Sequence, residues 1–247
     1  MIISDDSAQN LDLQNVNEYD ILLCFASDGL TIFISDQSKT LLSTRSFPFD
    51  GFYTANAQEI IQLLMAVSEM KLNFNSVRLV CESERYTFVP VPFFKAEEAE
   101  LFLSYQQLIT EKEVALYNVL ANLATVNVFS LAKGLQAALT QLFPQCTVEH
   151  QQSYFLTEKV TFTPENSMQV WVRDKVMDVV VLMNGNLQLI NSYSYSSAED
   201  FVYYILLIYE QLSLNMETDR LQLYNMKKRE KMSQLIENYV KNVNCIS

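Results

Sequence analysis

Residues 168–194 read MQVWVRDKVMDVVVLMNGNLQLINSYS, and they give the clearest indication of the protein's architecture. Apolar and β-branched residues dominate three short runs that are separated by polar residues, a pattern typical of consecutive strands. The Asn184-Gly185 dipeptide between the second and third runs is a strong signal for a tight hairpin turn. The predicted strands cover 168–173, 178–183 and 187–194.

A helix and a further strand follow these three strands. Ser197 is a favourable N-cap residue, and the apolar residues after it predict a helix as far as Leu212. This helix is apolar nearly all round, which indicates burial on several sides. A strand is predicted over 221–224 and a last helix over 226–240.

The N-terminal part repeats this order after a polar arm. It has three strand-like runs, a helix capped by Asn56, another strand and another helix. The predicted segments are strands over 19–26, 30–35, 40–47 and 77–81, an extended segment over 85–94 and a helix over 97–108. Extended segments over 114–120 and 126–131 and a helix over 134–143 come next, and residues 147–162 fit neither period.

The repeat is also visible in individual residues. Leu72-Asn73-Phe74 and Arg78-Leu79 match Leu214-Asn215-Met216 and Arg220-Leu221, and the offset in numbering is the same for every matched pair. A fixed offset of this kind predicts a structural duplication. We therefore expect an α/β protein with mixed sheets, divided into a polar arm over 1–18, a first half over 19–113 and a second half over 114–247.

A duplicated strand–strand–strand–helix–strand–helix order resembles the actin-like ATPase fold, which is ribonuclease H-like in each half. The segment 168–225 resembles pilus-assembly proteins of that superfamily. Over its whole length the chain resembles a bacterial family of unknown function, the domain family numbered 3822. The resemblance implies an actin-like fold and implies no particular activity.

The resemblance also locates where phosphates would bind, in the first hairpin turn of each half. In the first half, Asp28 adjoins Gly29 directly, which departs from the spacing of actin-like ATPases. In the second half, Asp174 has no glycine near it. We therefore expect a non-enzymatic binding or scaffold protein. The alternative is an ATP-binding protein or weak ATPase with degenerate phosphate loops, in which Asp28, Gly29 and Asp174 line the nucleotide site.

Composition excludes several other functions. The chain has only four glycines among 247 residues, and they are widely separated, so neither a Rossmann fingerprint nor a P-loop is present. The net charge of −12 opposes binding to nucleic acid. We expect no signal peptide and no membrane span, a cytoplasmic location and four free cysteines.

Other chemistry has little support from the residues. His150 is the single histidine, and no Gly-x-Ser-x-Gly motif accompanies it, so we expect no catalytic role for it. No group of histidines and cysteines has the spacing of a zinc site. We expect no catalytic residue, no metal and no cofactor, and the remaining partner class is another protein, with the oligomeric state open.

The last predicted helix carries an apolar stripe that must be covered. The stripe comprises Met232, Leu235, Ile236, Tyr239 and Val240. We expect it to pack on the sheet of the second half, with the basic run Lys227, Lys228, Arg229 and Lys231 facing solvent.

Overall fold

The computed structural model describes residues 4–6, 16–26, 29–49, 51–105, 109–172, 175–226 and 230–246. The chain divides into two compact units, residues 1–157 (unit 1) and 158–247 (unit 2). The sequence predicts a division after residue 113 instead. The structure differs because the strands that follow residue 113 pair with a strand of unit 1, as described below.

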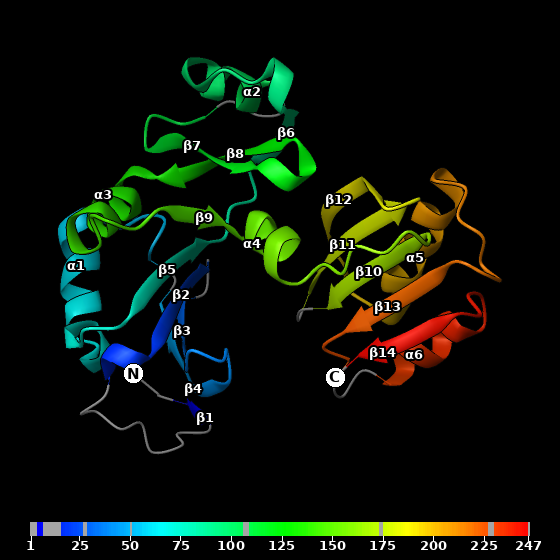
Figure 1. The fold of residues 1–247 in the computed structure, drawn as a ribbon, viewed down its shortest axis with the longest axis horizontal. Coiled ribbons are helices and arrows are strands. Elements are labelled where there is room, and N and C mark those ends of the chain that lie inside the picture. The colour runs from blue at the N-terminus through cyan, green and yellow to red at the C-terminus, as the bar shows by residue number, and fades with distance from the viewer. Residues whose placement is uncertain are drawn as a thin grey trace. The chain divides into compact units, whose positions relative to one another are not determined.

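The main sheet of unit 1 is mixed and has the strand order β1-β4-β3-β2-β5-β9 (Figure 1). Strands β2, β3 and β4 are consecutive and antiparallel, and β5 and β9 add parallel to β2. The strands are β1 (Ser4–Asp6), β2 (Asp20–Ala26), β3 (Gly29–Ser35), β4 (Leu41–Pro48), β5 (Ser76–Cys81) and β9 (Val148–His150). Inward residues of β2 and β3 alternate with less buried ones, as a sheet covered chiefly on one face requires.

Two helices cover the apolar face of this sheet. Helix α1 (Ala57–Met65) begins with a capping box, in which the Asn56 side chain accepts from the Glu59 amide and Glu59 accepts from the Asn56 amide. Helix α3 (Lys133–Leu142) packs beside α1, and both contribute buried side chains to one core with β2 and β3. Helix α4 (Gln151–Glu158) follows β9.

Residues 82–132, which we call the insert, separate β5 from α3. They form a small antiparallel sheet of order β6-β8-β7, and helix α2 (Ala99–Ser104) lies on it (Figure 1). The strands are β6 (Tyr86–Pro90), β7 (Glu113–Leu120) and β8 (Thr125–Ala132). A separate core under α2 contains Leu103, Val126 and Val128.

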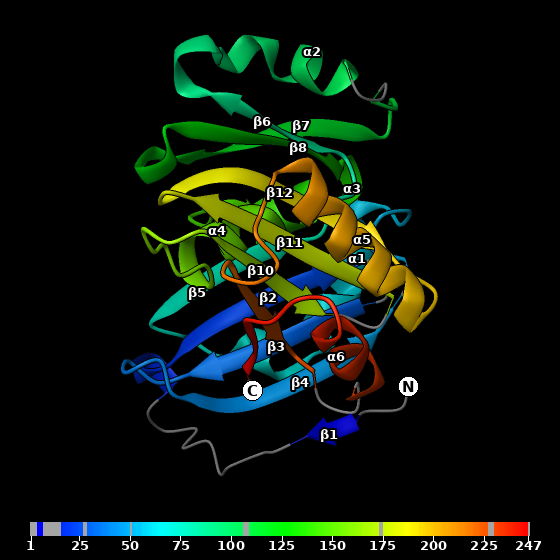
Figure 2. The same cartoon turned by 90° about the vertical axis from the view of Figure 1, so that its right-hand side faces the viewer.

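Unit 2 repeats the main sheet without an insert. Its order is β12-β11-β10-β13-β14, with the first three strands antiparallel and the last two parallel to β10. Figure 2 shows the helices α5 and α6 on one face of this sheet. The elements are β10 (Ser167–Val172), β11 (Val176–Met183), β12 (Asn186–Ser194), α5 (Ala198–Gln211), β13 (Arg220–Tyr224), α6 (Glu230–Glu237) and β14 (Val243–Ile246).

Two local predictions in unit 2 are confirmed. The turn between β11 and β12 is Asn184-Gly185, with φ of 51° and 75°, which explains the glycine at its second position. The Ser197 side chain accepts from the Asp200 amide at 3.0 Å and caps α5.

The last helix is shorter than predicted. Helix α6 begins at Glu230 and ends at Glu237. The basic residues 227–229, predicted to face solvent, lie outside the described residues. Met232, Ile236 and Val240 are buried in the unit 2 core, as predicted for docking on its own sheet. Tyr239, predicted in the same stripe, is 48% exposed because α6 ends at Glu237 and Tyr239 lies beyond the helix.

The duplication holds in strand register. Leu23 pairs with Leu79 in unit 1 and Met168 pairs with Leu221 in unit 2, so the predicted match of Leu79 with Leu221 places both at the same point of their sheets. The helix of unit 1 that corresponds to α6 is α3, because each precedes the last parallel strand of its sheet. The segment predicted as the second helix of the first half contains α2, which belongs to the insert.

The described part of the chain contains no helix with the length and apolarity to cross a membrane.

Candidate functional site

The predicted phosphate-binding positions are only partly described by the structure. Asp28 and Asp174 lie outside the described residues. Gly29 begins β3 with φ of 154°, and a Cβ atom added there would lie 2.3 Å from the Phe47 carbonyl oxygen. The close approach of β3 to β4 therefore requires glycine at this position, independently of any ligand.

Aromatic side chains occupy the carboxyl end of the central strands in unit 1. The Tyr53 hydroxyl donates to the carbonyl of Glu82, directly after β5, and lies 3.3 Å from the Phe25 carbonyl near the end of β2. Phe52 is fully buried beside them, and its ring centroid lies 5.2 Å from that of Phe25. Burial raises the pKa of the Tyr53 hydroxyl far above its ordinary value, so this group stays a neutral donor.

The single histidine lies in a buried polar network of unit 1. His150 ends β9 and has no exposed surface. Its Nδ1 atom lies 3.0 Å from Asn127 Nδ2 and 3.2 Å from the Gln152 amide nitrogen, and its Nε2 atom lies 3.0 Å from the Ser83 carbonyl oxygen. Because Nδ1 faces two donors and Nε2 faces an acceptor, the ring is neutral with its proton on Nε2.

The hydrogen bonds of this network connect neighbouring strands of unit 1. Burial lowers the pKa of His150 to about 4, and the hydrogen bond to the Ser83 carbonyl offsets that effect only in part. Both ring nitrogens take part in hydrogen bonds within this network. His150 joins β9 to the end of β5 and to β8 of the insert through these bonds.

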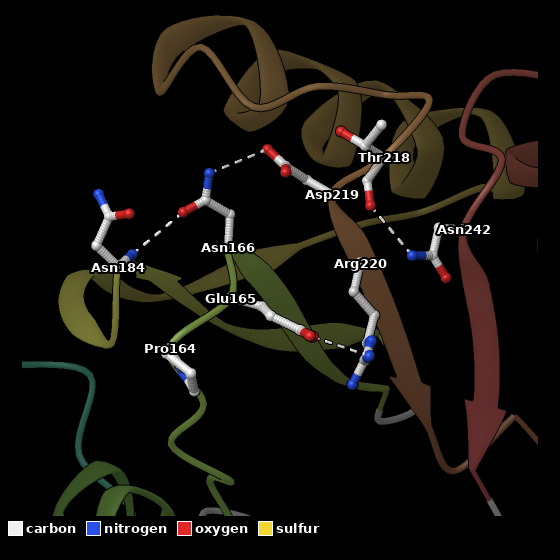
Figure 3. A pocket seen from close by; sticks show the side chains of 8 residues that line it. All are labelled: Pro164, Glu165, Asn166, Asn184, Thr218, Asp219, Arg220 and Asn242. Carbon is white, nitrogen blue, oxygen red and sulfur yellow. Dashed lines mark hydrogen bonds and ion pairs between the residues drawn. The ribbon is translucent and has the colours of Figure 1, made fainter.

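Unit 2 has a polar hollow of about 410 Å³ (Figure 3). Asn166 links its sides, because its Oδ1 accepts from the Asn184 amide at 3.1 Å and its Nδ2 lies 3.4 Å from Asp219 Oδ2. Asn242 donates to the Thr218 carbonyl at 3.1 Å. The hollow is also lined by Pro164, Glu165 and Arg220, and the last two form an ion pair of 2.9 Å.

The position of this hollow separates it from the predicted nucleotide site. Asn166, Arg220 and Asn242 stand at or just before the first residues of three parallel strands, β10, β13 and β14. Val172, the last residue of β10, lies at the opposite ends of these strands, and Asp174 itself lies outside the described residues. The polar side chains of the hollow hold loops together, and their bonds to one another account for their presence.

The insert carries the largest concentration of exposed apolar side chains. Of the eleven large hydrophobic residues that are exposed in the described part of the chain, six belong to it. We call these six residues the insert surface: Val91, Phe93, Leu101, Tyr105, Tyr117 and Val119. Phe93 and Tyr105 are the most exposed, at 71% and 76%.

Strand register explains why β7 contributes to this surface. Val119 pairs with Val126 and Tyr117 pairs with Val128. Both partners are buried under α2, so Tyr117 and Val119 share the face that α2 covers elsewhere. Helix α2 leaves these two residues 44% and 57% exposed at the edge of the sheet. The insert surface has no signal in the sequence, because its residues come from a 3-10 helix (Val91–Phe93), from α2 and its C-cap, and from β7.

The base of the insert is anchored by a charged group. Glu113 forms an ion pair with Arg85 and accepts hydrogen bonds from Thr110 and Ser130. Burial would raise the pKa of Glu113, but these bonds outweigh it, and the pKa lies below its ordinary value. Glu113 therefore stays ionised, and its bonds join the start of β7 to β8 and to the residue before β6.

Solved structures define the class of this protein. A Bacteroides thetaiotaomicron protein with an actin-like ATPase fold and unknown function is similar, with a TM-score of 0.81, 21% identity and coverage of 96% of this chain and 94% of that one. A chain of the PilM–PilN type IV pilus biogenesis complex has a TM-score of 0.57 and 13% identity, with coverage of 92% of this chain and 88% of that one. The ethanolamine utilization protein EutJ from Carboxydothermus hydrogenoformans has a TM-score of 0.50 and 7% identity, with coverage of 95% of this chain and 88% of that one. The chain has the actin-like ATPase fold, as predicted.

Family membership follows from the sequence itself. Residues 8–243 match the model of the family described as "Protein of unknown function (DUF3822)", and the chain belongs to this family. A comparison with curated proteins finds no match. The predicted resemblances to this family and to a pilus-assembly protein are therefore confirmed.

Proposed function

We propose that this protein is a non-enzymatic protein-binding module, in which the actin-like fold supports the insert surface. One observation carries the proposal. Unit 2 completes the same kind of sheet with no insert, so the fold itself does not require residues 82–132. An addition that the fold does not need, and that exposes six large apolar side chains, is typical of a docking surface.

The residues around the insert surface indicate the chemistry of the partner. Glu97, Glu100 and Glu111 are exposed on the same segment of the chain. Unit 1 as a whole has 8 basic against 18 acidic residues. A protein segment with apolar residues flanked by lysine or arginine would complement this surface. The PilM–PilN complex supports this kind of role, since it has a chain of the same fold in a protein complex.

A crosslinking experiment tests the proposal. A photoreactive amino acid at Phe93 should give a specific adduct in the cell of origin, and the same group at Leu41, an exposed residue of β4, should not. The captured protein is then purified and titrated against this protein by calorimetry. The double variant Phe93→Ser/Val119→Thr should weaken binding at least about tenfold, and Leu41→Thr should leave it unchanged. Equal affinities for the two variants would contradict the proposal.

A nucleotide titration separates the proposal from the ATP-binding alternative. A ligand at 100 times its Kd would add about 2.7 kcal/mol of stability and raise the melting temperature by several degrees. We propose that ATP does not bind, so millimolar Mg-ATP should raise the melting temperature by less than about one degree. A reproducible rise of several degrees that is lost in Asp28→Ala would instead favour a nucleotide site at Asp28, Gly29 and Asp174.

A further inference from the structure

The two units differ at one edge of their main sheets. In unit 1 the third strand of the meander, β4, pairs with the short strand β1. In unit 2 the third strand of the meander is β12, and among the described residues it pairs with β11 alone. The nine residues of β12 are thus a sheet edge at the position where unit 1 holds an added strand.

Strand registers show that the two edge positions correspond. Starting from the matched pair Leu79 and Leu221, the pairing can be followed across each sheet. The rows are Leu79, Leu23, Ile32, Arg45 in unit 1 and Leu221, Met168, Val181, Leu189 in unit 2. Arg45 pairs with Asp5 of β1, so Leu189 stands where unit 1 receives a strand from outside the meander. Because Leu189 is apolar where unit 1 has Arg45, we expect a strand that pairs with β12 to be uncharged at this position.

Other sheet edges have features that discourage pairing. Asn118 covers the edge of β9, because it accepts from the His150 amide at 2.8 Å and donates to the Val148 carbonyl at 2.9 Å. Strand β6 ends in Pro90, and β14 has four residues. Natural sheets block edges in these ways to prevent unwanted association. Strand β12 has neither a proline nor a charge.

The chemistry of β12 suits a second copy of the same strand. Residues 179–198 contain no charged side chain, although the whole chain carries a net charge of −12. Two copies can therefore approach at this segment with little direct repulsion. The edge also carries aromatic side chains, since Tyr193 lies 5.2 Å from Tyr204 of α5 between ring centroids, and the neighbouring Tyr203 is 59% exposed.

We infer that β12 pairs antiparallel with β12 of a second copy and joins two unit 2 sheets across a two-fold axis. The Tyr195 amide donates to the Lys175 carbonyl at 2.9 Å. In an antiparallel pair, the backbone groups of successive residues point alternately toward the partner strand and away from it. The backbone groups of Ile190 and Ser194 therefore point away from β11. A two-fold axis at Asn191 places that residue opposite its own copy. Leu189 then lies opposite Tyr193 of the second copy, on the face covered by α5.

Charge placed at Asn191 tests both the contact and its register. Asn191 is exposed, so Asn191→Asp and Asn191→Lys should each fold normally. Sedimentation velocity between about 1 and 500 µM should show concentration-dependent dimers of the wild-type protein. Each variant alone should raise the dimer Kd at least about tenfold, because like charges face each other across the axis. An equimolar mixture of the two variants should restore the dimer.

Controls distinguish this contact from others. Asn244→Asp places the same charge on the exposed part of β14, at the other edge of the sheet, and should leave the dimer Kd unchanged. Circular dichroism of all variants should match the wild-type spectrum. A wild-type protein that stays monomeric over this range would overturn the inference. So would a dimer that survives both charged variants. Neither outcome affects the insert surface, which is tested by the Phe93 crosslink.

Discussion

Residues 82–132 of unit 1 and residues 225–229 of unit 2 occupy the same place in chain order, between the fourth strand of the main sheet and the next helix on it. Despite this difference in length, β5 and β13 take the same parallel place beside β2 and β10, and β9 and β14 complete the two sheets in the same way. The common element is therefore three antiparallel strands, a helix, a parallel strand, a second helix and a last parallel strand. The insert and β1 are additions to it.

Features that only one of the two units has are the best candidates for function in this protein. Residues shared by the two units, such as the capped helices and the buried row from Leu79 to Ile32, are explained by the sheet and its core. What only one unit has is not required by the fold. Unit 1 alone has the insert with its apolar surface, and unit 2 alone has an uncovered β12 edge among the described residues.

The largest effect should come from a charge in the unit 2 core. Ile236 has no exposed surface, so Ile236→Asp should destabilise unit 2 by about 4 kcal/mol or more. Trp171 is the only tryptophan and belongs to β10, so urea denaturation followed by its fluorescence reports on unit 2. Tyr239→Asp is the matched control and should leave the midpoint nearly unchanged, because Tyr239 is 48% exposed. Equal effects would mean that α6 does not pack on this sheet.

The next effect belongs to unit 1 and depends on pH. The pKa of His150 is about 4 in the folded state and near 6.5 when unfolded, so the unfolded chain binds more protons between these values. The stability of unit 1 should therefore fall by up to about 3 kcal/mol as the pH drops from 7 to 4. Circular dichroism measures it, with Trp171 fluorescence as an internal comparison.

His150→Asn should flatten that pH dependence, since the variant has no imidazole to protonate in the unfolded state. The variant should also be less stable at pH 7, because it loses at least one of the bonds to Asn127 and Ser83. An unchanged pH slope in the variant would assign the acid sensitivity to other groups.

Capping residues should give smaller and matched effects in the two units. Asn56→Ala and Ser197→Ala each remove a side-chain acceptor from the first turn of α1 or α5, and each should cost about 1 kcal/mol. Urea midpoints from circular dichroism, compared with Trp171 fluorescence, should assign the first loss to unit 1 and the second to unit 2. A loss in both units from one substitution would show that the units unfold together.

The smallest effect should come from the exposed ion pair of Lys231 with Glu199. The atoms lie 3.1 Å apart, but the side chains are 76% and 64% exposed. Solvent and salt screen such a pair, so Lys231→Ala should leave the fluorescence midpoint within error of the wild type. A clear loss would indicate that the pair supports the contact between α5 and α6.

Strongly periodic elements were predictable from the sequence, and short ones were not. The hairpin at Asn184-Gly185 and the caps Asn56 and Ser197 have local signals that need no tertiary context. Strands β9 and β14 have three and four residues, too few for a period of two to stand out, and their places are set by the neighbouring parallel strand.

In the candidate site, too, features with a local signal were predictable and features set by distant residues were not. His150 was visible as the single histidine, but its neutral state depends on Asn127 and Ser83, which are distant from it in the chain. The insert surface depends on how α2 covers some residues of β7 and β8 and not others. No local pattern encodes that coverage.

The insert also affects how the chain folds. In unit 1 the last parallel pairing joins Leu79 to Val148, across the whole insert, whereas in unit 2 it joins Leu221 to Val243 through a much shorter stretch of chain. Loop-closure entropy makes the longer connection costlier by about 1 kcal/mol, and non-local pairing slows folding. Unit 2 should therefore close its sheet first. When the complete chain refolds, unit 1 would leave the edge of β5 open for longer, and an unpaired strand edge is prone to aggregation.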